Sequence, residues 1–263
     1  MEKLDLQTIR ISVAGGVATL CLARPESRNA LNVQMCRDIV AACEALDADG
    51  SVRVILVRGE GAAFCAGADL KERQTMSAAE MVARRVDGFT AYAALERLSK
   101  PAVAVVHGPA FGSGCEIAGA CDFVLASTDA VFCYPEVGWG TVGATQRLPR
   151  IVGRRMAKEL LFSGRKIAAE EARELGLVNH VYPSAELDAH VQELAVKMAK
   201  ANPLTVALTK RSIDAGLDTT REGAMAQELL AIQENLRHSD WKKAISGFGS
   251  AGAPDNAGAR NAS

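Results

Sequence analysis

Blocks of apolar residues, separated by short polar or glycine-containing segments, predict β-strands in the first part of the chain. TIRISV and VATLCLA flank AGG, which is the pattern of a β-hairpin. Four further segments have the length and composition of strands, and the first two are typical of buried ones: VRVILVRG, PAVAVVHG, CDFVLAS and VFCYP.

Amphipathic segments between and after these strands predict helices. Asn32 precedes VQMCRDIVAACEALD, whose apolar residues recur at helical spacing. The segment SAAE at 77–80 has the spacing of a capping box and opens a helix that runs to about Leu98. From about Gly153 onward the pattern is helical almost throughout, in IAAEEARELG, SAELDAHVQELAVKMAKA, PLTVALTKRSIDAG and residues 219–237.

Strands mixed with helices, followed by helices alone, indicate an α/β core with a helical appendage. We place the core at residues 1–200, a C-terminal helical region at 201–248 and a tail at 249–263. The tail is rich in Gly, Ala and Asn, so we expect it to be disordered. Apolar faces on the C-terminal helices need a surface to bury against, which predicts contact with a neighbouring subunit.

Composition and charge narrow the class of protein. The chain has 263 residues, 49% of them hydrophobic, and a net charge of −1, so no basic excess indicates a nucleic-acid partner. No segment approaches the ~18 uninterrupted apolar residues of a membrane span. The 7 cysteines are scattered without CxxC spacing, which favours reduced thiols over disulfides or a metal site. We therefore expect a protein of the cytoplasm.

Two segments share one plan: VRVILVRGEGAAFCAGADL and PAVAVVHGPAFGSGCEIAG. Each runs from an apolar strand through a glycine and a short loop to a helix start, where free backbone N–H groups favour negative charge. If the strands are neighbours, two N–H donors can converge on one oxygen and form an oxyanion hole. The alternative is that the glycines only make tight turns. A phosphate cradle fits less well, because Ile117 occupies the third glycine position of G-x-G-x-x-G.

Several motifs resemble those of the enoyl-CoA hydratase/isomerase family, which has the crotonase fold. They are FCAGADLKER, KPAVAVVHGPAFGSGCEIAGACDFVLAS, YPEVG and TQRLPRIVGRRMAKELLFSGRKIAAEEARELGLVNHV. The resemblance extends roughly from Leu20 to Ile213, and CAGADLKER followed by MS is most similar to enoyl-CoA and methylglutaconyl-CoA hydratases. It implies an α/β fold with a crotonase-like ββα spiral core and a C-terminal helical trimerisation region.

The resemblance also implies the catalytic residues. The oxyanion-hole donors correspond to the backbone N–H groups of Ala68 and Ser113, and the two catalytic carboxylates correspond to Glu116 and Glu136. Ser113 replaces the usual glycine, so its side chain could crowd the thioester. We expect at least one carboxylate to titrate high in an apolar pocket provided by Phe111, Phe132, Trp139 or their neighbours.

The substrate-binding residues follow from the same resemblance. Arg28 is expected to contact the CoA phosphates, and Trp139 lies in a loop that borders the acyl pocket in relatives. This loop, GWGTVGATQRL, is ~3 residues shorter than is common in the family, so the acyl group stays undetermined. The other expected binding positions are Ala66, Gly67, Asp69, Leu70 and Gly112.

Other chemically suggestive residues receive structural interpretations. We expect His107 to be a hydrogen-bonded core or loop histidine and Cys115 to be no nucleophile, because no histidine partner is evident. Metal-ligand spacing is absent among the histidines. Three basic pairs are interpreted as solvated helix faces: Arg84–Arg85, Arg154–Arg155 and Lys242–Lys243.

The sequence thus predicts an enoyl-CoA hydratase that uses a CoA thioester as substrate, needs no further cofactor or metal and assembles as a homotrimer or hexamer. The alternatives are an enoyl-CoA isomerase, a hydroxycinnamoyl-CoA hydratase-lyase, or a non-catalytic acyl-CoA-binding protein. One related lineage binds RNA through a lysine-rich helix. Here Arg37 is outnumbered on that helix by Asp38, Glu44 and Asp47, which argues against RNA.

Overall fold

The computed structural model describes residues 4–246, so the predicted tail lies outside the described residues. The chain divides into two compact units, residues 1–201 and residues 202–263. Over the range that is described, no helix has both the length and the apolar character required to cross a bilayer.

The larger sheet contains six strands among the described residues, in the order β1-β2-β3-β4-β6-β9. β1 and β2 form the predicted hairpin and pair antiparallel, whereas the later neighbours in this sheet are parallel. The strands are β1 (Ile9–Ala14), β2 (Val17–Leu22), β3 (Val54–Gly59), β4 (Ala102–Val106), β6 (Phe123–Ser127) and β9 (His180–Tyr182).

A smaller sheet has the order β5-β7-β8, formed by β5 (Pro109–Phe111), β7 (Val131–Cys133) and β8 (Lys166–Ala168). The sequence pattern predicted a loop through Phe111 and helices from Gly153 onward, and β5, β8 and β9 show that this was wrong at these places. Each of the three strands has only three residues, which is too short for a two-residue alternation to be recognised.

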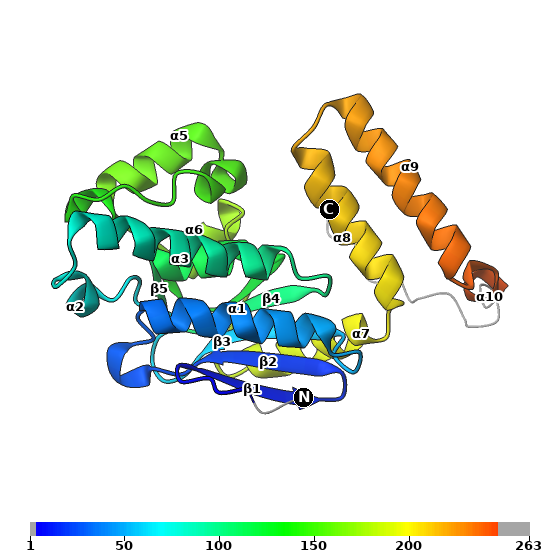
Figure 1. Ribbon diagram of the computed structural model, residues 1–263, viewed down its shortest axis with the longest axis horizontal. Coiled ribbons are helices and arrows are strands. Elements are labelled where there is room, and N and C mark those ends of the chain that lie inside the picture. The colour runs from blue at the N-terminus through cyan, green and yellow to red at the C-terminus, as the bar shows by residue number, and fades with distance from the viewer. Residues whose placement is uncertain (1–3, 247–263) are drawn as a thin grey trace, which may run out of the picture. The chain divides into compact units, whose positions relative to one another are not determined.

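Helices cover both faces of the larger sheet. α1 (Val33–Ala48) and α3 (Ala78–Glu96) run side by side over one face (Figure 1), where they enclose the main core together with α4 (Ser113–Ala120). α7 (Leu187–Ala199) covers the opposite face and buries Leu187, Val191 and Ala195 against valines of the sheet. The sheet is therefore enclosed on both faces, as parallel strands require.

The two long helices begin where the sequence predicts. The Asn32 side chain accepts a hydrogen bond from the Met35 N–H at 2.8 Å, which caps α1. Ser77 and Glu80 form the reciprocal capping box at the start of α3. Both predictions are confirmed.

Shorter elements complete the first unit. They are the 3-10 turns η1 (Pro25–Ser27) and η2 (Val137–Trp139) and the helices α2 (Leu70–Arg73), α5 (Arg147–Ser163) and α6 (Ala169–Glu174). The seven cysteines are free thiols, and six of them are buried. Burial raises the pKa of Cys36 to about 12 and that of Cys65 to about 11, so these thiols stay protonated near neutral pH.

In the second unit, α8 (Pro203–Leu217) and α9 (Arg221–His238) pack against each other, and α10 (Trp241–Ser246) follows. Asn202 caps α8 through bonds from two backbone N–H groups, with a proline at the first helical position. A bond between Thr205 and Asn235 joins the start of α8 to the end of α9, so the pair is antiparallel. Large apolar side chains are exposed on both helices: Ile213, Leu217, Met225, Leu229, Leu230, Ile232 and Leu236.

Candidate active site

The two loops with the shared sequence plan lie against each other. Their strands, β3 and β4, are parallel neighbours, so both loops leave the same edge of the sheet. Beyond the strands, the Phe111 N–H donates to the Cys65 carbonyl at 2.9 Å, and the Cys65 N–H donates to the Pro109 carbonyl at 3.1 Å. These bonds hold residues 65–68 beside residues 109–113.

The backbone N–H groups of Ala68 and Ser113 are free of hydrogen bonds within residues 4–246. The surroundings of Gly67 show how close they lie, because a methyl group there would be 4.0 Å from the Ser113 nitrogen and 3.0 Å from the Phe111 carbonyl oxygen. Ser113 is also the first residue of α4, where the helix leaves N–H groups without internal partners. This geometry suits two donors that share one oxygen.

The Ser113 side chain contacts Tyr92. It is 6% exposed and forms a side-chain hydrogen bond with the buried Tyr92, whose pKa burial raises and this bond partly lowers. Gly112, the preceding residue, has φ 47°, a conformation that L side chains rarely adopt.

Both predicted carboxylates are buried beside these loops. Glu116 lies in the first turn of α4 and is 7% exposed, and Glu136 precedes η2 and is 8% exposed. A methyl group on Gly112 would lie 3.0 Å from Glu136 Oε1, so this carboxylate adjoins the loop of Ser113. The other oxygen of Glu136, Oε2, is buried without a hydrogen-bond partner among the described residues. Unpaired buried acceptors are rare and often mark a functional site.

Burial is the main reason that the pKa of each carboxyl is raised. For Glu116, the Arg147 guanidinium opposes this shift, and the negative charge of Glu136 adds to it. For Glu136, a backbone hydrogen bond and the charges of Arg85 and Arg73 oppose it. Two carboxyls with raised pKa values, next to free N–H donors, are the groups that acid–base chemistry on a polarised carbonyl compound requires.

The raised pKa of Glu136 gives a stability prediction. The folded protein binds this proton more tightly than the unfolded chain, so the stabilising contribution is fully present below the ordinary value of 4.5 and is lost as pH rises through the folded pKa. Glu136→Gln should therefore raise the melting temperature at pH 8 by a few degrees and by less at pH 5. Melting curves at both pH values test this, with Glu193→Gln on the exposed surface of α7 as the control. An equal shift at both pH values would contradict it.

With this geometry established, sequence comparison identifies the family. The profile of the enoyl-CoA hydratase/isomerase family matches residues 12–256. The chain belongs to this family.

Individual members of the family are similar along nearly their whole length. A short-chain-enoyl-CoA hydratase of Clostridium acetobutylicum is 36% identical over 249 residues, which cover 93% of this chain and 95% of the relative. A 2,3-dehydroadipyl-CoA hydratase of Escherichia coli is 37% identical over 243 residues, covering 91% and 94%. The crystal structure of an enoyl-CoA hydratase from Bacillus anthracis superposes with a TM-score of 0.89 at 32% identity, covering 92% and 96%. The crotonase fold predicted from the motifs is confirmed.

In this member of the enoyl-CoA hydratase/isomerase family, an arginine that the sequence did not single out holds Glu116. Arg147 Nη1 donates to Glu116 Oε2 at 3.1 Å, and two further bonds join Arg147 to Glu96. The guanidinium also lies 5.2 Å from the ring centroid of Tyr92. Arg147 stands 31 positions from Glu116, so spacing alone gave no signal of the contact.

Removing this cation should change the titration of Glu116. Because Arg147 lowers the pKa of Glu116, Arg147→Gln should raise that pKa and move the acid limb of the kcat/KM profile to higher pH. Loss of a charge-assisted bond should also reduce kcat at pH 7 roughly tenfold. The pH profile of hydration measures both effects, with Arg154→Gln on the exposed side of α5 as the control. A lower melting temperature with an unchanged profile would indicate a purely structural role.

The expected nucleotide-binding residues lie together at the opposite end of the same loop. The Ala66 N–H donates to the Arg28 carbonyl at 2.9 Å, and the Arg28 side chain is exposed. Asp69 caps α2 and forms an ion pair with Arg24 at 3.0 Å, so its carboxylate already has partners in the protein. Asn29, another residue that the sequence did not single out, fixes this loop by donating to the carbonyls of Glu60 and Ala63.

The environments of several aromatic and basic residues differ from those that the sequence predicted. Phe132 is part of the hydrophobic core, whereas Trp139 is 65% exposed on η2, so Trp139 does not enclose a carboxylate in this structure. The solvated-face interpretation is wrong for Arg84, which is 4% exposed and donates to the Leu31 carbonyl. Arg85 is half-buried and donates to Thr141.

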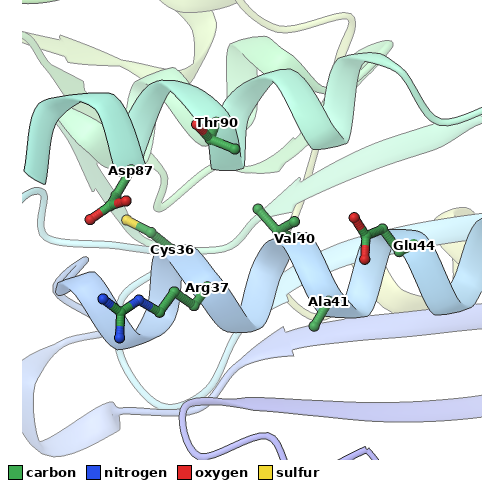
Figure 2. A pocket seen from close by; sticks show the side chains of 7 residues that line it. All are labelled: Cys36, Arg37, Val40, Ala41, Glu44, Asp87 and Thr90. Carbon is green, nitrogen blue, oxygen red and sulfur yellow. The ribbon is translucent and has the colours of Figure 1, made fainter. Parts of the chain in front are cut away.

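The remaining features, which are His107 and the groove between α1 and α3, lie outside the candidate active site. The His107 ring is hydrogen-bonded to the Gly61 carbonyl at 2.8 Å, as predicted. An open groove of about 270 Å³ lies between α1 and α3. Figure 2 shows the side chains that line it, and none of the predicted site residues is among them. Across residues 4–246, no group of three or more His, Cys, Asp or Glu side chains is arranged to hold a metal ion.

Proposed function

We propose that the protein is an enoyl-CoA hydratase, a hydro-lyase that adds water reversibly across the 2,3 double bond of an enoyl-CoA thioester. The observation that carries this proposal is the burial of two carboxyls, Glu116 and Glu136, beside two free backbone N–H groups. The relatives named as hydratases support it, because they match the chain over its length.

The proposed roles follow the charge changes of the reaction. When water adds to C3, negative charge builds on the thioester oxygen, and the N–H groups of Ala68 and Ser113 stabilise it. Glu136 and Glu116 hold the water, accept its proton and supply a proton to C2, so the thioester gains one OH and one H. These steps use only the CoA thioester, water and the protein's own groups, so we propose no further cofactor.

The CoA moiety is proposed to bind along the loop that carries the donors. Arg28 would contact a phosphate, and the backbone from Ala66 to Leu70, including Gly67, would line the adenine side. Gly112 would leave room for the thioester, and Trp139 would border the acyl end. The exposure of Arg28 and its contact with Ala66 support this arrangement.

Three alternatives predict different outcomes. An isomerase needs only one carboxylate to move a proton, a hydratase-lyase would cleave an aromatic acyl chain, and a binding protein would leave every thioester unchanged. The burial of both carboxyls with raised pKa values favours the hydratase.

Enoyl-thioester absorbance tests the proposal directly. The purified protein should consume crotonyl-CoA with loss of this absorbance and yield 3-hydroxybutyryl-CoA. Methylglutaconyl-CoA and an aromatic enoyl-CoA test the breadth of the acyl site. Shifted double bonds without hydration would identify an isomerase, aldehyde release from the aromatic substrate would identify a hydratase-lyase, and no turnover with any of the three would refute an enzyme of this class.

A homotrimer, or a hexamer made of two trimers, is the proposed assembly. The exposed apolar side chains of α8 and α9 support it, since such surfaces are usually buried against a partner. Light scattering at micromolar concentration should give three or six times the chain mass of 27.7 kDa, and a mass of one chain would refute the proposal. We further propose a cytoplasmic location without nucleic-acid or membrane partners, supported by the free thiols and the near-zero net charge.

A further inference from the structure

A cluster of arginines lies beside Glu136. Arg85 Nη2 donates to Thr141 Oγ1 at 3.3 Å, which brings the guanidinium to the loop that follows η2. A methyl group on Gly143 would lie 3.3 Å from Arg85 Nη1 and 2.8 Å from Glu136 Cγ. Arg85 and Glu136 therefore adjoin the same small volume.

Arg73 belongs to the same cluster. It is the last residue of α2, five positions after Ala68, and it is half-buried. Its pKa is lowered by burial first, then by the like charges of Arg84 and Arg85, and it is raised by Glu136. Arg73 is therefore close enough to Arg85 and Glu136 for their charges to interact.

The three arginines of the cluster are not equivalent. Arg84 has partners, because it donates to the Leu31 carbonyl and lies 3.4 Å from a Glu72 oxygen. Arg73 and Arg85 take part in no ion pair within residues 4–246. Half-buried cations without a counter-ion are costly, and a planar guanidinium pair matches the two oxygens of a carboxylate.

The position of the cluster along the substrate follows from the proposed function, on which this inference rests. The thioester oxygen lies at Ala68 and Ser113, and the CoA side extends toward Arg28. With Glu136 acting at C3 in the proposed reaction, we place the acyl chain beyond C3 on the side of Glu136 where Arg85 lies. We propose that Arg73 and Arg85 form an anion subsite that selects enoyl-CoA thioesters whose acyl chain ends in a carboxylate.

Another role for the pair would be to act on Glu136 alone. Both arginines lower the pKa of Glu136, so they could tune its titration without contacting the substrate. The two roles differ in one observable quantity. Tuning of Glu136 affects all substrates equally, whereas a subsite affects only those with a terminal carboxylate.

Binding of saturated thioesters tests the subsite without requiring turnover. We use two pairs that match in chain length: glutaryl-CoA with pentanoyl-CoA, and adipyl-CoA with hexanoyl-CoA. In calorimetry, the wild-type protein should bind the carboxylated member of at least one pair about tenfold to a hundredfold more tightly. Arg73→Met and Arg85→Met should each reduce that ratio at least fivefold, and Arg85→Lys should retain part of it.

Arg97→Met is the matched control, because Arg97 is exposed at the far end of α3 and should leave the ratio unchanged. Wild-type ratios below threefold for both pairs would overturn the subsite, as would a preference that survives both methionine variants. Hydration is scored separately with enoyl substrates. A protein that prefers adipyl-CoA but hydrates none of them would refute the proposed function while leaving the anion subsite in place.

Discussion

Replacement of Glu116 or Glu136 by glutamine should reduce kcat for hydration of an enoyl-CoA by about 10² to 10⁴. Glutamine keeps the shape of the side chain but cannot exchange a proton with water or with C2. Both carboxyls are buried and have raised pKa values, so each is suited to proton transfer near neutral pH.

The measurement is the rate of absorbance change with crotonyl-CoA, together with the affinity for unreactive butyryl-CoA. Affinity should stay nearly constant, because proton transfer and not shape has been changed. Glu193→Gln on the exposed surface of α7 serves as the matched control. If one glutamine variant keeps wild-type turnover, that carboxyl is not needed, and a one-carboxylate isomerisation becomes the better description.

Gly114→Ala should damage the site through the backbone. A methyl group at position 114 would lie 2.3 Å from the Cys65 carbonyl oxygen and 3.0 Å from Cys65 Cβ, so the two loops must move apart. We expect a loss of about 3 kcal/mol in the free energy of unfolding, the upper end of the usual range for overpacking. Displacement of the Ser113 donor by about 1 Å should also reduce kcat about 10²-fold.

Gly119→Ala provides a control within the same helix. A methyl group there would lie 3.6 Å from Ile151 Cδ1, an ordinary contact, and alanine favours the helix by about 0.5–1 kcal/mol. In chemical denaturation, Gly114→Ala should lower the free energy of unfolding and Gly119→Ala should raise it slightly. In the crotonyl-CoA assay, only Gly114→Ala should lose turnover. If Gly114→Ala and Gly119→Ala have the same stability and the same turnover, the close approach of the two loops is not required.

Much of the fold could be predicted from local pattern. The hairpin, the buried strands and the two capped helices have clear signals, because turn residues, caps and apolar periodicity act over a few positions. Strands such as β9 were missed because pairing with a distant neighbour creates them. His180 pairs with Leu125, 55 positions earlier, and no local propensity records that partner.

The site divides in the same way. Glu116 and Glu136 stand in recognisable motifs, and the parallel plan of the two loops predicted where free N–H groups would occur. Arg147 and the pair of Arg73 and Arg85 could not be found, because a buried carboxylate implies a nearby cation without indicating which of 30 lysines and arginines provides it. Only tertiary structure selects these three.

The free donors beside Glu136 belong to the main chain, and this has a consequence for how the site tolerates sequence change. Every residue except proline at positions 68 and 113 retains its N–H group, so a substitution that fits the available space there keeps the donor. Substitutions at Gly112 and Gly114 would instead be poorly tolerated, because these glycines allow the loops to approach each other. In a saturation scan, the proposed oxyanion-hole donors would therefore be revealed by the intolerance of the neighbouring glycines more than by the chemistry of their own side chains.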